Sequence, residues 1–240
     1  MISIIIPTLN EESTIEKLLS QFSDELIRKY EIELILSDGG STDQTIEIAK
    51  KKVHIILDEM RGRKQTIGGG RNRGARRSSG DVLFFFNADV RVNDMEKFFK
   101  AMLEALRSPD VVAATCPVHV YAEEETFLDQ VYHRIHNLHV RLFNALHFGT
   151  GRGECQVIKR SAFFGVGGYD ERLAAGEDFD LYRRLARRGK IKYVEDVKAY
   201  ESPRRYRRLG YLRVTCSWFL NALSIILLRR SFSREWEPVR

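Results

Sequence analysis

An amide and a carboxylate stand two positions apart at the end of an apolar run, at Asn87 and Asp89. The run from Leu83 to Phe86 contains aromatic residues and has no helical period, which is typical of a buried strand. In open α/β sheets, ligands bind just beyond the carboxyl ends of such strands. The pair could therefore hold a hard cation or a phosphate-bearing substrate. It could also form an ordinary polar turn, because Asn and Asp are common turn residues.

Three carboxylates cluster at Glu177, Asp178 and Asp180, where an apolar pattern predicts the start of a helix. A carboxylate held at a fixed position could act as a general base toward a substrate hydroxyl. The cluster could instead cap the helix, because a helix N-terminus stabilises negative charge.

A second candidate site is a basic segment that includes the run Gly68-Gly69-Gly70. A glycine-rich basic loop ahead of a helix suits a diphosphate, which backbone N–H groups and guanidinium groups both favour. The spacing is not that of a Walker A loop. Nucleic acid is the competing partner, but aromatic residues do not interleave with the basic ones, so none is expected. The outer arginines at 76 and 77 could simply be solvated. The basic residues are Arg61, Arg63, Lys64, Arg71, Arg73, Arg76 and Arg77.

The bulk composition fits a folded chain with anionic partners. Of 240 residues, 43% are hydrophobic and 30% are charged, which excludes a disordered chain, and the net charge of +6 favours nucleotides or phospholipid head groups. The three cysteines form no CxxC pair, so neither a disulfide framework nor a zinc ribbon is expected. The first apolar run is too short for a signal peptide, and a cytoplasmic location is the expectation.

Strand and helix patterns alternate in the first half of the chain. Strands are expected at 2–7, 32–36, 53–57, 81–86 and 111–118. Helices are expected over 15–26 (capped by Asn10 or Ser13), up to residue 49 (capped at 42–43) and over 95–106. This alternation predicts a mostly parallel α/β sheet with helices on both faces.

A long helix is predicted over 127–146, with one apolar face. Its histidines, with His147 at the end, recur in three-residue steps without a carboxylate motif, so they read as a polar helix face in preference to a metal site. The glycines of 149–153 indicate a mobile or closely packed loop at an acceptor site, or a plain connection. The apolar positions are Phe127, Leu128, Val131, Ile135, Leu138, Leu142 and Leu146.

Six blocks then occur in order: IIPTLNEE at 5–12, SDGGSTDQT at 37–45, GRNRG at 70–74 followed by Gly80-Asp81, Asn87-Ala88-Asp89, GGYDE at 167–171 and GED at 176–178. In this order they resemble a family 2 glycosyltransferase of the GT-A fold, over about residues 1–200. The resemblance implies a Rossmann-like sheet in a catalytic domain over 1–208. Its nucleotide-sugar half would be 1–118 and its acceptor half 119–208, followed by a helical tail over 209–240.

The resemblance also implies roles for particular residues. Asp38 would bond the nucleotide base, Arg71 would approach the sugar, and Asp89 would hold Mg²⁺ or Mn²⁺. Asp178 would be the base in a single displacement with inversion, supported by Glu177 at the acceptor site. The segment that would line the nucleotide pocket comprises Pro7, Thr8, Leu9 and Glu11.

Two departures from the family pattern bear on the cation. The usual acidic DxD is Asn-Ala-Asp here, so Asn87 could bond a ribose but supplies no charge. No histidine follows His147 as a possible metal ligand. Glu201 could replace it, or Arg204 and Arg205 could neutralise the diphosphate directly.

The stretch 209–228 is apolar, with arginines on both sides. It has the length of a membrane span, but Arg213 would be costly in a bilayer. An interfacial helix bound to anionic lipid through 204–230, packing on the catalytic domain, and a homodimer contact all remain open.

The sequence thus predicts an inverting, metal-assisted glycosyltransferase with a nucleotide-sugar donor. Its acceptor group would be a hydroxyl or a phosphate, on a molecule that is either lipid-linked at the inner face of the cell membrane or soluble. A nucleotide-sugar-binding protein with weakened catalysis is the main alternative. A nucleotidyltransferase is a further alternative, but this sequence lacks the glycine-rich motif of such enzymes near the first strand.

Overall fold

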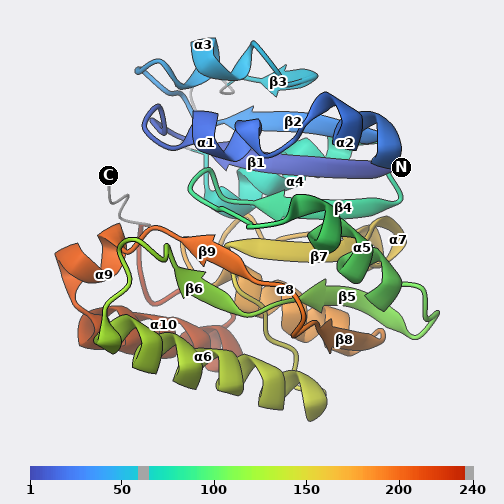
Figure 1. The fold of residues 1–240 in the computed structure, drawn as a ribbon. Helices are drawn as coiled ribbons and strands as arrows, with labels where there is room; N and C mark the ends of the chain where they lie inside the picture. The colour runs from blue at the N-terminus through green and yellow to red at the C-terminus, as the bar shows by residue number, and fades with distance from the viewer. Residues whose placement is uncertain (59–64, 236–240) are drawn as a thin grey trace.

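The computed structural model describes residues 1–58 and 65–235. Its centre is a seven-stranded sheet in the order β3-β2-β1-β4-β7-β5-β8, and β6 pairs with β9 in a small second sheet (Figure 1). Strand β7 is antiparallel to both of its neighbours, and the other pairs are parallel. The strands are β1 (Ile2–Thr8), β2 (Ile32–Asp38), β3 (Ile55–Leu57), β4 (Val82–Phe86), β5 (Val111–Thr115), β6 (Val118–Val120), β7 (Cys155–Lys159), β8 (Lys190–Tyr193) and β9 (Ala199–Glu201).

Helices cover both faces of the sheet, as the alternating pattern predicted. Successive side chains of β4 point to opposite faces, so Phe84 and Phe86 join one apolar core while Leu83 and Phe85 join the other. The helices are α1 (Ile15–Ser20), α2 (Asp24–Tyr30), α3 (Thr45–Ala49), α4 (Ile67–Arg77), α5 (Met95–Ala105), α6 (Phe127–Ala145), α7 (Arg160–Gly165), α8 (Glu177–Ala186), α9 (Arg204–Leu209) and α10 (Tyr211–Leu228).

Two predicted elements are split. The helix expected over 15–26 is α1 followed by α2, and the predicted caps are wrong: Thr14 precedes α1 without a capping bond, while the hydroxyl of Ser23 caps α2. The strand expected over 111–118 divides into β5 and β6, which belong to different sheets. Pro117 lies between them and lacks the N–H that a continuous ladder needs.

The three glycines predicted to form a phosphate-binding loop lie inside α4, so that prediction is wrong for them. Glycine is a poor helix former, so its presence in α4 is explained by close packing of the helix against other parts of the protein. At Gly74 a Cβ atom would lie 2.4 Å from Cγ2 of Ile5, so a side chain would push α4 away from β1. The basic residues predicted at 61, 63 and 64 lie outside the described residues.

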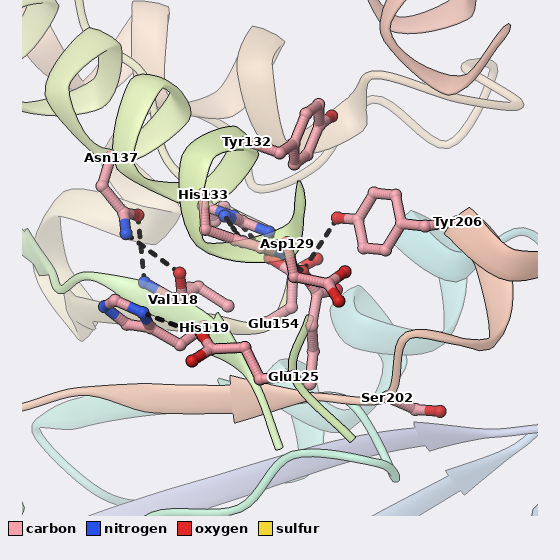
Figure 2. A network of polar contacts seen from close by, with 12 residues as sticks. Val118, His119, Glu125, Asp129, Tyr132, His133, Asn137, Glu154, Ser202 and Tyr206 are labelled. Atoms are coloured by element: carbon pink, nitrogen blue, oxygen red, sulfur yellow. Dashed lines mark hydrogen bonds and ion pairs between the residues drawn. The ribbon is translucent and has the colours of Figure 1, made fainter. Parts of the chain in front are cut away.

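Helix α6 carries the apolar stripe that the sequence predicted. Its apolar residues face outward, with Ile135 66% exposed and Leu138 52% exposed. The face turned to the protein is polar, and it includes His133, so the row of histidines is not simply a solvated face. Asn137 explains the orientation, because its amide bonds both the N–H and the C=O of Val118 at the edge of β6 (Figure 2).

The loop at 149–153 is closely packed against α8. A Cβ atom at Gly151 would lie 2.6 Å from the ring of Tyr182, and Gly149 has a φ of 72°. The close-approach interpretation of these glycines is therefore confirmed. The loop also brings the carbonyl of Gly153 into the site described next.

Candidate active site

The predicted site residues converge at one edge of the central sheet. Thr8 and Asp38 are paired at the carboxyl ends of β1 and β2. Phe86, at the end of β4, is paired with Cys155, at the start of the antiparallel β7. The segments that follow β1, β2 and β4 and the segment that precedes β7 therefore share the edge where open α/β sheets bind ligands.

Arg71 on α4 is the centre of one polar cluster at this edge. It is 1% exposed, and its Nη1 donates to Oε1 of Glu177 at 2.9 Å. Its Nη2 donates at 2.8 Å both to Oδ1 of Asn87 and to the carbonyl of Gly153. A planar guanidinium can make such forked contacts and stays charged when buried, so one side chain fixes three separate segments.

Glu177 and Asp178 begin α8 beside Arg71, as predicted. Burial and the negative charge of Glu177 raise the pKa of Asp178 to about 7, against the opposing effect of Arg71. A Cβ atom built at Gly153 would lie 3.5 Å from both Asp178 Oδ2 and Arg71 Nη2, so the glycine leaves this space open. A carboxylate with a pKa near neutrality is suited to accept a proton at physiological pH.

Arg204 forms a second cluster by bridging two carboxylates. Its Nη2 lies 3.0 Å from each carboxylate oxygen of Glu11 and 3.1 Å from Oδ2 of Asp89. Burial raises the pKa of Asp89 to about 6 even though Arg204 opposes the shift. A positive charge thus lies between these two carboxylates, and it is the guanidinium of Arg204 at the start of α9.

A comparison of the chain with protein families agrees with this arrangement. The model of Glycosyl transferase family 2 matches residues 3–164, which is more than half of the 240 residues. The chain belongs to glycosyl transferase family 2. The family predicted from the order of the sequence blocks is thereby confirmed.

Relatives in this family are distant. The chain is 30% identical over 94 residues to the poly(ribitol-phosphate) beta-N-acetylglucosaminyltransferase TarS of Staphylococcus aureus, covering 38% of this chain and 16% of TarS. It is 26% identical over 250 residues to the succinoglycan biosynthesis protein ExoA of Rhizobium meliloti, covering 98% of this chain and 75% of ExoA. It spans 48% of validoxylamine A glucosyltransferase, so several curated relatives are much longer.

The solved structures show the fold. A mannosyltransferase, PcManGT from Pyrobaculum calidifontis, in complex with GDP-Man and Mn²⁺, has a TM-score of 0.72 to this chain at 19% identity. The match covers 94% of this chain and 64% of PcManGT. The predicted GT-A architecture is confirmed.

In this family 2 chain, the segment predicted to line the nucleotide pocket follows β1. Thr8 is buried, and its hydroxyl donates to Oδ1 of Asp38 at 3.0 Å, whereas Leu9 is 37% exposed and Pro7 is partly buried. Asp38 also accepts bonds from the Gly40 N–H and from both the N–H and the hydroxyl of Ser41. With four bonds inside the protein, Asp38 shapes the turn after β2, and a direct bond to a base would replace one of them.

Glu201 and Arg205 were also predicted around the cation. Glu201 is buried and accepts bonds from Arg152 Nη2 at 2.5 Å and Tyr206 Oη at 2.9 Å, so it belongs to the Arg152 network in this structure. Arg205 is partly buried next to Arg204, and burial lowers its pKa.

The sequence prediction missed several supporting residues. Asn72 bonds the N–H and C=O of Tyr169 and so links the GRNRG block to the GGYDE block. Arg73 bonds the carbonyls of Asp38 and Leu57 at the ends of β2 and β3. Both residues lie inside the quoted GRNRG block, and Gly153 lies in the glycine-containing loop at 149–153, so each of them had a usable signal.

The residues at Asp89 can be tested for fit to a divalent cation. Among residues 1–58 and 65–235, no group of three or more His, Cys, Asp and Glu side chains is arranged to hold a metal ion. Asn87 gives its amide oxygen to Arg71, which leaves Asp89 and Glu11. Mg²⁺ commonly takes one or two carboxylates and completes its coordination with substrate phosphates. These two carboxylates therefore fit a cation that arrives with a diphosphate, in competition with Arg204.

Proposed function

We propose that this chain transfers a sugar from a nucleotide-sugar donor to an acceptor hydroxyl with inversion at the anomeric carbon. One observation carries the proposal: in a family 2 chain, a carboxylate with a pKa near 7, Asp178, lies beside the buried Arg71 at the ligand-binding edge of the sheet. In a single displacement, the acceptor oxygen attacks the anomeric carbon as the bond to the nucleoside diphosphate breaks. Asp178 takes the proton of the acceptor hydroxyl.

Arg71 and Glu177 position the reacting groups in this proposal. The guanidinium holds Glu177, Asn87 and the Gly153 carbonyl in fixed places, so that donor and acceptor meet at a preformed surface. Glu177 raises the pKa of Asp178 by its own negative charge. The base assignment thus depends on both carboxylates of the pair, with different roles.

The leaving diphosphate is negatively charged, and a positive group near Asp89 would neutralise it. A divalent cation held by Asp89 and Glu11 would neutralise the diphosphate when bound. Arg204, which occupies the space between these carboxylates, would either be displaced toward the diphosphate or supply the charge itself. The substitution Asp89→Asn distinguishes the role of the cation from that of Arg204. If the variant still binds the donor but the binding no longer depends on Mn²⁺, the remaining positive charge is assigned to Arg204.

The full chain incubated with a panel of nucleotide sugars and Mn²⁺ tests the proposal. Release of a nucleoside diphosphate that depends on an added acceptor and is abolished in Asp178→Asn would support it. Donor binding by calorimetry without release or transfer at any cation concentration would overturn it in favour of a nucleotide-sugar-binding protein. If the chain neither binds a donor nor releases a nucleoside diphosphate, both the transferase and the nucleotide-sugar-binding protein are overturned.

The apolar and basic C-terminal region bears on the class of acceptor. We propose a lipid-linked acceptor presented at the inner face of the cell membrane. A radiolabelled sugar that partitions into organic solvent after reaction with a membrane extract would support this acceptor, whereas transfer only to water-soluble products would overturn it.

A further inference from the structure

Helices α6 and α10 expose an apolar surface. On α6, Ile135, Leu138 and Leu142 are 66%, 52% and 50% exposed. On α10, Phe219 and Leu227 are 66% and 68% exposed. Soluble monomers rarely expose contiguous apolar patches of this kind unless the patch binds something. The outward faces of α6 and α10 are called the apolar platform below.

The two helices are fixed to each other, so the platform is one surface. They lie side by side at one end of the molecule (Figure 1). The rings of Tyr132 and Tyr211 are 4.8 Å apart, and those of His136 and Trp218 are 5.4 Å apart. Asp129 of α6 accepts bonds from Arg207 and Tyr211. Helix α10 is therefore attached to the body of the protein through α6, and is not a loose tail.

Most of the charge around the platform is positive, although exposed acidic residues also lie next to it, at Glu123 and Glu124 before α6 and at Glu195, which pairs with Arg141. Residues 204–230 contain seven arginines and no Asp or Glu. The single acidic residue of α6, Asp129, is fully buried and paired with Arg207. Arg208, Arg213 and Arg230 are exposed. An apolar face with a predominantly basic border is complementary to the acyl chains and the anionic head groups of a membrane surface.

We propose that the apolar platform docks on an anionic lipid bilayer, with α6 and α10 both lying in the interface. The inference does not rest on the proposed transfer reaction. It also extends what the sequence indicated for 204–230, since α6 supplies a large part of the lipid-facing surface through its apolar stripe.

Two other occupants fit less well. Among the described residues, Tyr211–Leu228 is the one helix long and apolar enough to span a membrane. Spanning would expose Arg213 to acyl chains and would withdraw Ile225 from its packing against Gly176. A second copy of the chain on the same face would bring two arginine borders together, which is repulsive.

Flotation of the full chain with phosphatidylcholine vesicles, with and without phosphatidylglycerol, tests the proposal. We expect binding to the anionic vesicles that weakens at high salt. Ile135→Glu should reduce the partition coefficient about tenfold or more, since a buried aliphatic side chain is lost from the interface. Arg213→Gln should reduce it about fivefold.

Matched controls lie on other surfaces. Phe164→Glu introduces a carboxylate at an exposed aromatic position on α7, and Lys100→Gln removes one exposed positive charge on α5. Both should bind vesicles like the unaltered chain, and circular dichroism should show that all four variants are folded.

Three results would overturn the proposal. The first is absence of binding to anionic vesicles, or equal binding by Ile135→Glu. The second is binding that survives a carbonate wash, which indicates an inserted α10. The third is a dimer in sedimentation velocity that Ile135→Glu dissociates while vesicles remain unbound, which assigns the platform to a second copy.

Discussion

Two buried arginines organise this molecule in contrasting ways. Arg71 lies at the ligand-binding edge of the sheet, and its Nε has no partner among the described residues. Arg152 lies under α6, where all three of its nitrogens are engaged, by Glu154, His133 and Glu201. The same side chain in a similar degree of burial thus keeps one unpartnered N–H in one place and has all three nitrogens paired in the other.

The carboxylates beside the two arginines differ in the same way. Burial alone would raise the pKa of Glu154, but Arg152 lowers it to about 2. Burial and the charge of Glu154 then raise the pKa of Glu201 well above its usual range, so this pair shares a proton inside a closed network. Figure 2 shows the hydroxyl of Tyr206 directed into that network. Asp178, in contrast, titrates near neutrality beside an open space. Burial of charge is therefore not by itself a mark of function.

The largest expected effect tests the structural arginine. Arg152→Met leaves two carboxylates buried without their cation and should lower the free energy of unfolding by about 3–5 kcal/mol in urea titrations. The matched control is Arg141→Met on the exposed side of α6, where the ion pair with Glu195 is solvated and the change should stay within about 0.5 kcal/mol. An Arg152 variant that is stable but inactive would erase the distinction between the two arginines.

The catalytic counterpart is Asp178→Asn. We expect kcat to fall about 10³-fold, which is about 4 kcal/mol of transition-state stabilisation, with the donor Kd and the unfolding midpoint unchanged. Asp180→Asn is the control, since Asp180 lies in the same helical turn but is paired with Arg184 at 2.6 Å. Equal loss of donor binding and turnover in Asp178→Asn would make that residue structural.

Arg71→Lys tests whether the forked contacts matter. A lysine keeps the charge but cannot reach Glu177, Asn87 and Gly153 together, so kcat/KM should fall about 10²-fold with a loss of about 1–3 kcal/mol in stability. Arg76→Lys, at an exposed position on the same helix, should change neither quantity. If Arg71→Lys were as active as the unaltered chain, a point charge would suffice there and the fork would be incidental.

The smallest effect is on the pH profile. Since Asp178 acts only when ionised and its pKa is about 7, kcat/KM should rise about tenfold per pH unit below pH 7 and level off above it. Glu177→Gln removes the neighbouring negative charge and should move this limb to lower pH. If the chemical step limits the rate throughout and kcat/KM does not change between pH 5 and 8, Asp178 is excluded as the base.

The sequence was sufficient for the central sheet and for the residues that its family blocks contain. Strand ends can be read from apolar runs, and ordered blocks bring Arg71, Asp89 and Asp178 to one edge. It failed where distant contacts override local preference. The apolar stripe of α6 could be read from the sequence, but the direction it faces could not, because Asn137 and Asn144 bond the backbone at Val118 and Thr150 and hold the polar face inward. Likewise, no local rule places Gly68–Gly70 in a helix, where Gly68 lies close to Tyr169 and Gly70 lies close to Gln65.

The bridge from Glu11 through Arg204 to Asp89 joins residues 193 positions apart in the chain. During synthesis, both carboxylates leave the ribosome long before the arginine that neutralises them. This edge of the sheet can therefore reach its final form only after α9 has emerged and folded back onto the sheet, which makes assembly of the candidate site a late event in folding of the nascent chain.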